Sequence, residues 1–197
     1  MTRSMRSLHL PATGLRAARP FALALTCAAL VGCHNPGPYG HAPNYAPLSE
    51  EESAIAGARE YDPVMFQRQP EEWRQKKSFL FGIVTARSAG PSGTAQVKLS
   101  VRRLEPRNLC TSVNDDDSCR VTVSDKDYGM VTAALSLQGE DDVGSKSVGA
   151  GSLLRVTGTF GQEVDPQDGS PLLRASYCRH FPRGFYVTSG AAEVMRQ

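Results

Sequence analysis

Residues 78–102 read SFLFGIVTARSAGPSGTAQVKLSVR and contain two stretches with the two-residue period of β-strands. In the first, residues 79–84 place apolar side chains on both faces, and Gly82 inside it indicates a bulge or a sharp bend. In the second, residues 95–102 alternate between apolar and polar side chains, which is typical of a half-buried strand. The glycine- and proline-containing segment 89–93 is a turn. The stretch therefore predicts two strands joined by a turn.

The same period returns further along the chain. Val121 and Val123 predict a third strand, and residues 128–137 (YGMVTAALSL) are compatible with either a short helix or another strand. Residues 139–151 form a polar loop. The remaining predicted strands are a fourth at residues 154–160, with Gly158 inside it, a fifth at 173–177, and a segment at 185–187 that extends the fifth or pairs beside it.

Five short strands, a strongly bent first strand and an insertion between the third and the fourth favour a mainly β fold, a small closed barrel. A small β-sandwich is the alternative. Before the barrel, Ser49 and Glu52 match a capping box, with Ser49 as the N-cap, and predict a helix from Glu50 to Glu60. A second short helix is expected from Pro70, with Trp73 anchoring it to the core.

The N-terminus has the pattern of a secretory signal. Residues 1–20 contain four arginines and no acid, and residues 21–31 (FALALTCAALV) are an apolar run too short to span a bilayer. The run ends on Leu30-Val31-Gly32-Cys33, which resembles the lipobox of bacterial lipoproteins that signal peptidase II cleaves. The resemblance implies cleavage before Cys33 and acylation of Cys33. An ordinary secreted protein with a chance cysteine is the alternative.

Cleavage at Cys33 changes the charge of the chain. It removes four arginines and no acid, so the formal charge falls from +2 to −2 over the remaining 165 residues. The basic balance of the precursor therefore belongs to the signal and does not indicate a nucleic-acid partner. No second apolar stretch of membrane length follows, so the acyl chains would be the only membrane attachment, and two or more are enough for stable anchoring.

Residues 34–48 are rich in proline and glycine, lack hydrophobic periodicity and predict a disordered, extended tether. His34 stands directly after Cys33, where aspartate favours inner-membrane retention of enteric lipoproteins. That resemblance implies attachment to the cell outer membrane, on its periplasmic or surface-exposed face.

A second resemblance lies in residues 66–77 (FQRQPEEWRQKK), which run into FLFGIV, and in residues 151–160 (GSLLRVTGTF). They look like the entry and the fourth strand of OB-fold lipoproteins, whose pattern has a glycine where this chain has Gln75. The resemblance implies a five-stranded OB-like barrel. The predicted organisation is a signal peptide at 1–32, a tether at 33–48, an N-terminal helix at 49–65, an OB-like domain at 66–190 and a C-terminal tail at 191–197.

Three cysteines remain in the predicted domain. Cys110 and Cys119 bracket TSVNDDDS, and a hairpin brings its two arms together, so a disulfide between them is the preferred pairing. Pairing of Cys178 with either one is the alternative. The spacing of Cys110 and Cys119 does not fit a metal site, and the three aspartates between them lack the glycine and distal glutamate of a calcium loop. No metal or other cofactor is predicted.

Four basic residues are candidate ligand contacts. Lys98, Arg102 and Arg120 are predicted on the polar face of strands two and three, with Arg174 near them. OB-folds use this face for oligonucleotides or oligosaccharides. Because no aromatic residues alternate with these bases, nucleic acid is disfavoured, and the candidate ligand is an envelope polysaccharide or the acidic patch of a partner protein. A solvated strand face is the competing interpretation.

The sequence offers little for catalysis. The predicted domain contains one histidine, His180, and lacks the motifs of serine hydrolases, zinc proteases and P-loop enzymes. A thiol-dependent activity at Cys178 lacks an orienting acid. The expected function is therefore a lipid-anchored envelope protein that acts as a non-enzymatic binding or assembly module with a protein partner. The alternative is a glycan-binding module using the basic face.

Overall fold

The computed structural model describes residue 39 and residues 41–112, 114 and 118–191, all of which belong to one unit, Asn35–Gln197. The predicted signal peptide, Cys33 and residues 192–197 of the predicted tail lie outside the described residues. Among the helices of the described residues, none combines the length and the hydrophobicity of a membrane span.

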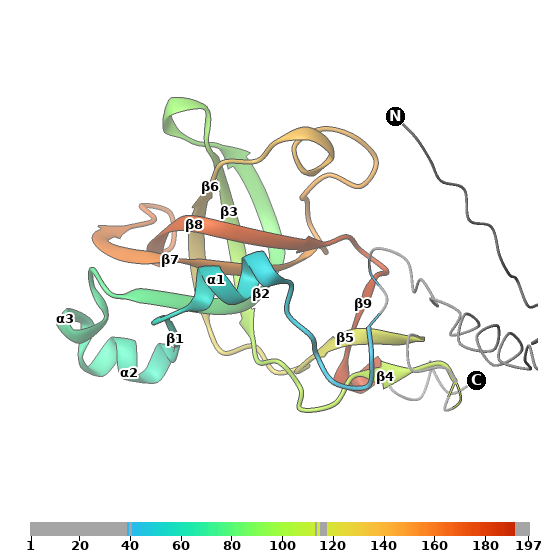
Figure 1. Ribbon diagram of the computed structural model, residues 1–197. Helices are drawn as coiled ribbons and strands as arrows, with labels where there is room; N and C mark the ends of the chain where they lie inside the picture. Colours follow the sequence, from blue (N-terminus) through green and yellow to red (C-terminus); the bar gives the residue numbers. More distant parts are fainter. Residues whose placement is uncertain (1–38, 40, 113, 115–117, 192–197) are drawn as a thin grey trace, which may run out of the picture. The chain divides into compact units, whose positions relative to one another are not determined.

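Five strands form a closed barrel (Figure 1). They follow the order β2-β3-β6-β8-β7, and β2 also pairs with β7, which closes the sheet on itself. All pairings in this ring are antiparallel except β6 with β8. The predicted mainly β class and the five-stranded OB-like barrel are thus confirmed. The strands are β2 (Lys77–Ala89), β3 (Ala95–Arg102), β6 (Met130–Leu135), β7 (Leu153–Val164) and β8 (Pro171–Phe181).

Strand β2 closes the barrel because it bends between its two neighbours. Its pairing with β7 ends at Ile83, and its pairing with β3 shifts register between Val84 and Ala86. The irregularity therefore follows the predicted position, Gly82, by a few residues. A side chain at Gly82 would bring its Cβ to 2.8 Å from the Cβ of Leu99. Glycine is needed there because it lets the two strands approach.

The third barrel strand differs from the prediction. Residues 119–123 form β5 (Cys119–Val123), which lies outside the barrel in a separate sheet with β4 (Leu109–Cys110) and β9 (Tyr186–Thr188). The barrel instead uses β6, from the segment that the sequence left open between helix and strand. Its residues Val131, Ala133 and Leu135 are fully buried, so tertiary packing decides the strand state where the sequence pattern is weak.

The predicted helix at 50–60 is shorter than expected and starts one residue earlier. Helix α1 (Ser49–Ile55) has Leu48 as its N-cap, and the carboxylate of Glu51, rather than that of Glu52, accepts from the Leu48 N–H at 3.2 Å. The chain after it forms β1 (Arg59–Glu60), which pairs in parallel with the start of β2. That pairing replaces helix hydrogen bonds in this segment.

Two further short helices follow, α2 (Pro63–Arg68) and α3 (Pro70–Trp73). Helix α2 was not predicted, and Asp62 caps it by accepting from the N–H groups of Val64 and Met65 at 2.9 and 3.0 Å. Trp73 is buried in the main core, as predicted. Three 3₁₀ turns complete the described elements: η1 (Pro91–Gly93), η2 (Gly139–Asp141) and η3 (Ser189–Ala191).

The prediction of a free tether is wrong for residues 41–48, which pack on the domain. The backbone of His41 exchanges two hydrogen bonds with Cys119 at 3.1 and 3.2 Å, and Asn108 binds the carbonyls of Ala42 and Pro43. Tyr45 packs edge-on against Phe81 at 5.6 Å between ring centroids. Irregular backbone carries no periodicity, so these contacts leave no pattern in the sequence. Residues 33–38 and 40 lie outside the described part.

Candidate functional site

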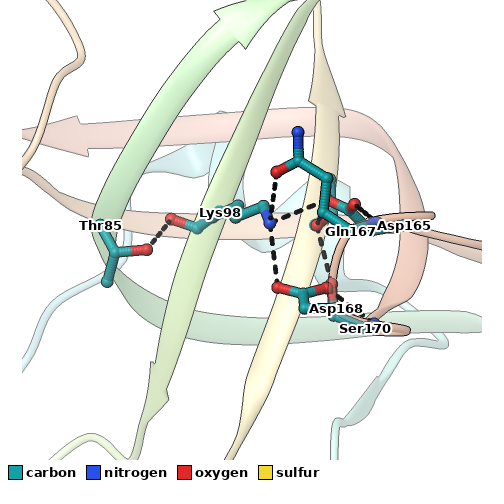
Figure 2. A network of polar contacts seen from close by, with 7 residues as sticks. Thr85, Lys98, Asp165, Gln167, Asp168 and Ser170 are labelled. Atoms are coloured by element: carbon teal, nitrogen blue, oxygen red, sulfur yellow. Dashed lines mark hydrogen bonds and ion pairs between the residues drawn. The ribbon is translucent and has the colours of Figure 1, made fainter.

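The predicted basic face does not present a free Lys98. Its ammonium lies 3.0 Å from Asp168 Oδ2 and 3.4 Å from Asp165 Oδ2, and it donates to Gln167 at 3.1 Å (Figure 2). Hydrogen bonds from Ser170 and then from Lys98 hold the pKa of Asp168 at about 2. The hydrogen bond to Asp168 raises the pKa of Lys98. Lys98 is therefore already bound to carboxylates of its own chain.

Those carboxylates belong to the loop between β7 and β8, which is fixed against the outer side of β3 and β6. Thr132 on β6 donates to Asp165 at 3.0 Å and lies 2.9 Å from the hydroxyl of Ser170. Figure 2 shows the loop residues gathered around the end of the Lys98 side chain. The loop therefore occupies this part of the strand face, where the sequence predicted an external ligand.

The other three predicted contacts do not form a site with Lys98. Arg102 donates to the backbone carbonyls of Ser124 and Asp125, and Arg174 forms an exposed ion pair with Glu163. Arg120 lies on β5, in the separate sheet, opposite Leu109. The prediction that Arg120 shares the barrel face is wrong, because the third barrel strand is β6. These four residues do not converge on one ligand position.

A buried ion cluster that the sequence did not predict joins α1 to the barrel. The Glu51 side chain is completely buried and forms ion pairs with Arg155 on β7 and, at 2.8 Å, with Arg179 on β8. The Tyr45 hydroxyl donates to the same carboxylate at 2.5 Å. Burial alone would raise the pKa of Glu51, but hydrogen bonds from Tyr45 and Arg179 and the charge of Arg155 lower it. The cluster keeps Glu51 ionised inside the protein.

His41 completes this cluster from the segment before α1. Its Nε2 lies 3.3 Å from the Arg179 guanidinium, and its ring stacks on Tyr45 with 5.2 Å between centroids. Burial and then the charge of Arg179 lower the pKa of His41 to about 4. His41 is therefore neutral at neutral pH, and its protonation would place a second positive charge beside Arg179.

We expect the stability of the protein to fall in mild acid through His41. The unfolded chain takes up a proton on His41 near pH 6.5 and the folded chain only near pH 4, so this contribution is complete above pH 6.5 and is lost as the pH falls toward 4. Between pH 7 and pH 5 the loss is about 1–2 kcal/mol. Urea unfolding at both pH values tests it. The variant His41→Asn should lose less unfolding free energy than the wild type between pH 7 and pH 5. An equal loss in both proteins would contradict the assignment of this pH dependence to His41.

A second unpredicted chain of hydrogen bonds contains His180. Its Nδ1 lies 2.7 Å from Asp141 and its Nε2 lies 2.9 Å from the Ser152 hydroxyl, so the structure supplies the acid that the sequence lacked. The sequence of contacts, from Asp141 through His180 to Ser152, is that of the acid, histidine and serine in a serine hydrolase triad. However, Ser152 is only 3% exposed, and the Gly149 N–H already donates to its hydroxyl at 3.2 Å. We interpret the chain as a link between η2, the start of β7 and the end of β8.

Cys110 and Cys119 form a disulfide across β4 and β5, the pairing that the sequence favoured. Cys178 is a free thiol on β8. Burial raises its pKa to about 12, with a smaller effect of Asp141, which keeps the thiol protonated and weakly nucleophilic at neutral pH.

Within the described part of the chain, no three side chains of the metal-binding types come together in a cluster. No protein-family model and no curated protein matches this chain.

Proposed function

We propose that this chain is a lipid-anchored protein of the bacterial cell envelope whose barrel domain acts as a non-enzymatic binding or assembly module. The N-terminal sequence supports an acyl anchor at Cys33, and the outer membrane is the proposed location. The partner is proposed to be another envelope protein or an envelope glycan.

The observation that carries this proposal is the attachment of residues 41–48 to the domain. Only eight residue steps separate Cys33 from His41, and such a segment spans at most about 29 Å. His41 is hydrogen-bonded to Cys119, and Tyr45 to the buried Glu51. A lipid at Cys33 would therefore hold the β4-β5-β9 side of the domain close to the membrane. A binding module with a restricted orientation fits this arrangement.

The chemistry of the described part also favours binding over catalysis. In the buried cluster, Glu51 forms ion pairs with both Arg155 and Arg179, and these contacts hold α1 to β7 and β8. The glycan-binding alternative is not favoured at the predicted basic face, because the loop after β7 already binds Lys98 there.

Membrane fractionation of a Cys33→Ser variant tests the anchor. We expect the wild type to sediment with the membranes and to partition into the detergent phase, and the variant to lose both properties. Cys27→Ser, a change in the predicted apolar run of the signal, is the matched control and should leave the fractionation unchanged. Sedimentation of Cys33→Ser with the membranes to the same extent as the wild type would reject the proposal.

A further inference from the structure

Two cations without a carboxylate partner in the described part of the chain face one cavity. Lys146 comes from the loop that precedes β7, and Arg183 from the turn that follows β8. The cavity between them has a volume of about 370 Å³. This contrasts with Arg87, Lys98 and Arg155, which are all paired with acids.

The acids of the neighbouring turn, residues 140–142, lie outside the lining of this cavity. No aspartate or glutamate lines it. Asp141 is hydrogen-bonded to His180, and Asp142 is paired with Arg87. Burial and then the charges of Asp141 and Glu140 raise the pKa of Tyr39, whose ring lies 4.4 Å from that of Phe185 between centroids. The lining itself contains two cations, Lys146 and Arg183, and no acid.

The walls of the cavity are fixed by contacts outside it. Arg87 donates to the carbonyl of the buried Val148 at 3.1 Å, and the Tyr186 hydroxyl donates to the Gly151 carbonyl at 2.9 Å. Gly151 has a φ of +87°, and a Cβ there would lie 3.2 Å from Cδ of Arg183. Glycine thus lets the Arg183 side chain lie against the loop. A cavity held in this way needs little reorganisation to bind a ligand.

The remaining lining groups define the ligand. The hydroxyls of Ser145 and Ser147 can donate and accept hydrogen bonds, and the ring of Phe185 supplies an apolar surface. The Lys146 ammonium lies 5.3 Å from the centre of that ring. Guanidinium and ammonium groups bind phosphate oxygens strongly, whereas hydroxyls and an aromatic face suit a sugar ring.

We propose that this cavity binds a sugar residue that carries a phosphate group. The inference rests on the proposed function as a binding module but not on the anchor, so loss of acylation at Cys33 would leave it intact. The proposed site lies in the loops beside the end of β8 and not on the basic strand face that the sequence predicted for a glycan.

Ligand-observed NMR of the detergent-solubilised full chain with α-D-glucose 1-phosphate tests the proposal. We expect a dissociation constant of about 0.1–1 mM, as for a small ligand at an open site, and weaker binding of glucose and of inorganic phosphate. Lys146→Ala/Arg183→Ala should weaken binding at least about tenfold. Both side chains are exposed, so the fold should be retained, which the melting temperature checks.

The matched control is Arg107→Ala/Lys126→Ala, which removes two exposed cations elsewhere. It should leave the dissociation constant within about twofold of the wild type. An equal loss in both double variants, equally tight binding of inorganic phosphate, or no binding of glucose 1-phosphate would each overturn the proposal.

Whether the sugar phosphate belongs to a membrane lipid or to a soluble polysaccharide is then tested with the Cys33→Ser full chain. The protein is incubated with phosphatidylcholine vesicles containing lipid A and, separately, with a soluble phosphomannan. If either material retains the protein, and the Lys146→Ala/Arg183→Ala changes abolish this retention, the proposal is supported and the retaining material identifies the source. If neither material retains the protein, the proposal is overturned.

Discussion

Replacement of Glu51 by alanine is expected to lower the free energy of unfolding by about 3–5 kcal/mol. The variant leaves Arg155, whose side chain is 6% exposed, without its ion-pair partner inside the protein. It also removes the acceptor of the Tyr45 hydroxyl and of the Leu48 N–H. An uncompensated buried charge costs more than the intact pair contributes, which explains the large expected effect.

Chemical denaturation of the wild type and of Glu51→Ala measures this change. Glu52→Ala, an exposed position on the same helix, is the matched control and should change the stability by no more than about 0.5 kcal/mol. In the double variant Glu51→Leu/Arg155→Met both charges are gone, so the loss should be smaller than the sum of the two single losses. A Glu51→Ala variant as stable as Glu52→Ala would show that the cluster does not hold α1 on the barrel.

Removal of the disulfide by Cys110→Ala/Cys119→Ala is expected to cost roughly 2–3 kcal/mol. The cross-link closes a loop of ten residues, and breaking it returns conformational entropy to the unfolded chain. The backbone of Cys119 also pairs with His41, so the segment before α1 should exchange its amide hydrogens faster in this variant.

Cys178→Ala is the control for the disulfide variant, because it removes the free thiol and no cross-link. Reductant should lower its unfolding free energy by the same amount as it lowers that of the wild type, because both proteins contain the Cys110–Cys119 disulfide. A disulfide variant that unfolds at the same denaturant concentration as the oxidised wild type would contradict the expected contribution.

Sequence periodicity was informative where one strand face is buried. Residues 95–102 alternate between apolar and polar side chains, and this pattern matches β3 closely. It failed for β6, because the alanines and the threonine in MVTAAL are compatible with either regular structure, and the choice depends on pairing with β3 and β8. It also misplaced β5, which is a strand as predicted but pairs with β4 and β9 in the separate sheet and not with the barrel strands. Alternating side chains therefore identify a strand but not the strands that it pairs with.

The candidate sites were harder to predict for a related reason. Its charge and its place on the polar face of a predicted strand indicate Lys98 as a ligand contact, but its partners Asp165 and Asp168 are far along the chain and reach it only through the β7–β8 loop. Glu51 stands beside the predicted capping residue Glu52, and nothing local indicates Arg155 and Arg179 as its partners. Pairing over such sequence distances is set by barrel topology.

Mass spectrometry of the intact protein purified from membranes tests the central claim most directly. A lipid-anchored domain predicts a chain that begins at Cys33 and carries the added mass of its fatty acyl groups. A chain that retains the preceding residues, or one whose Cys33 thiol and amino group are both unmodified, would contradict it.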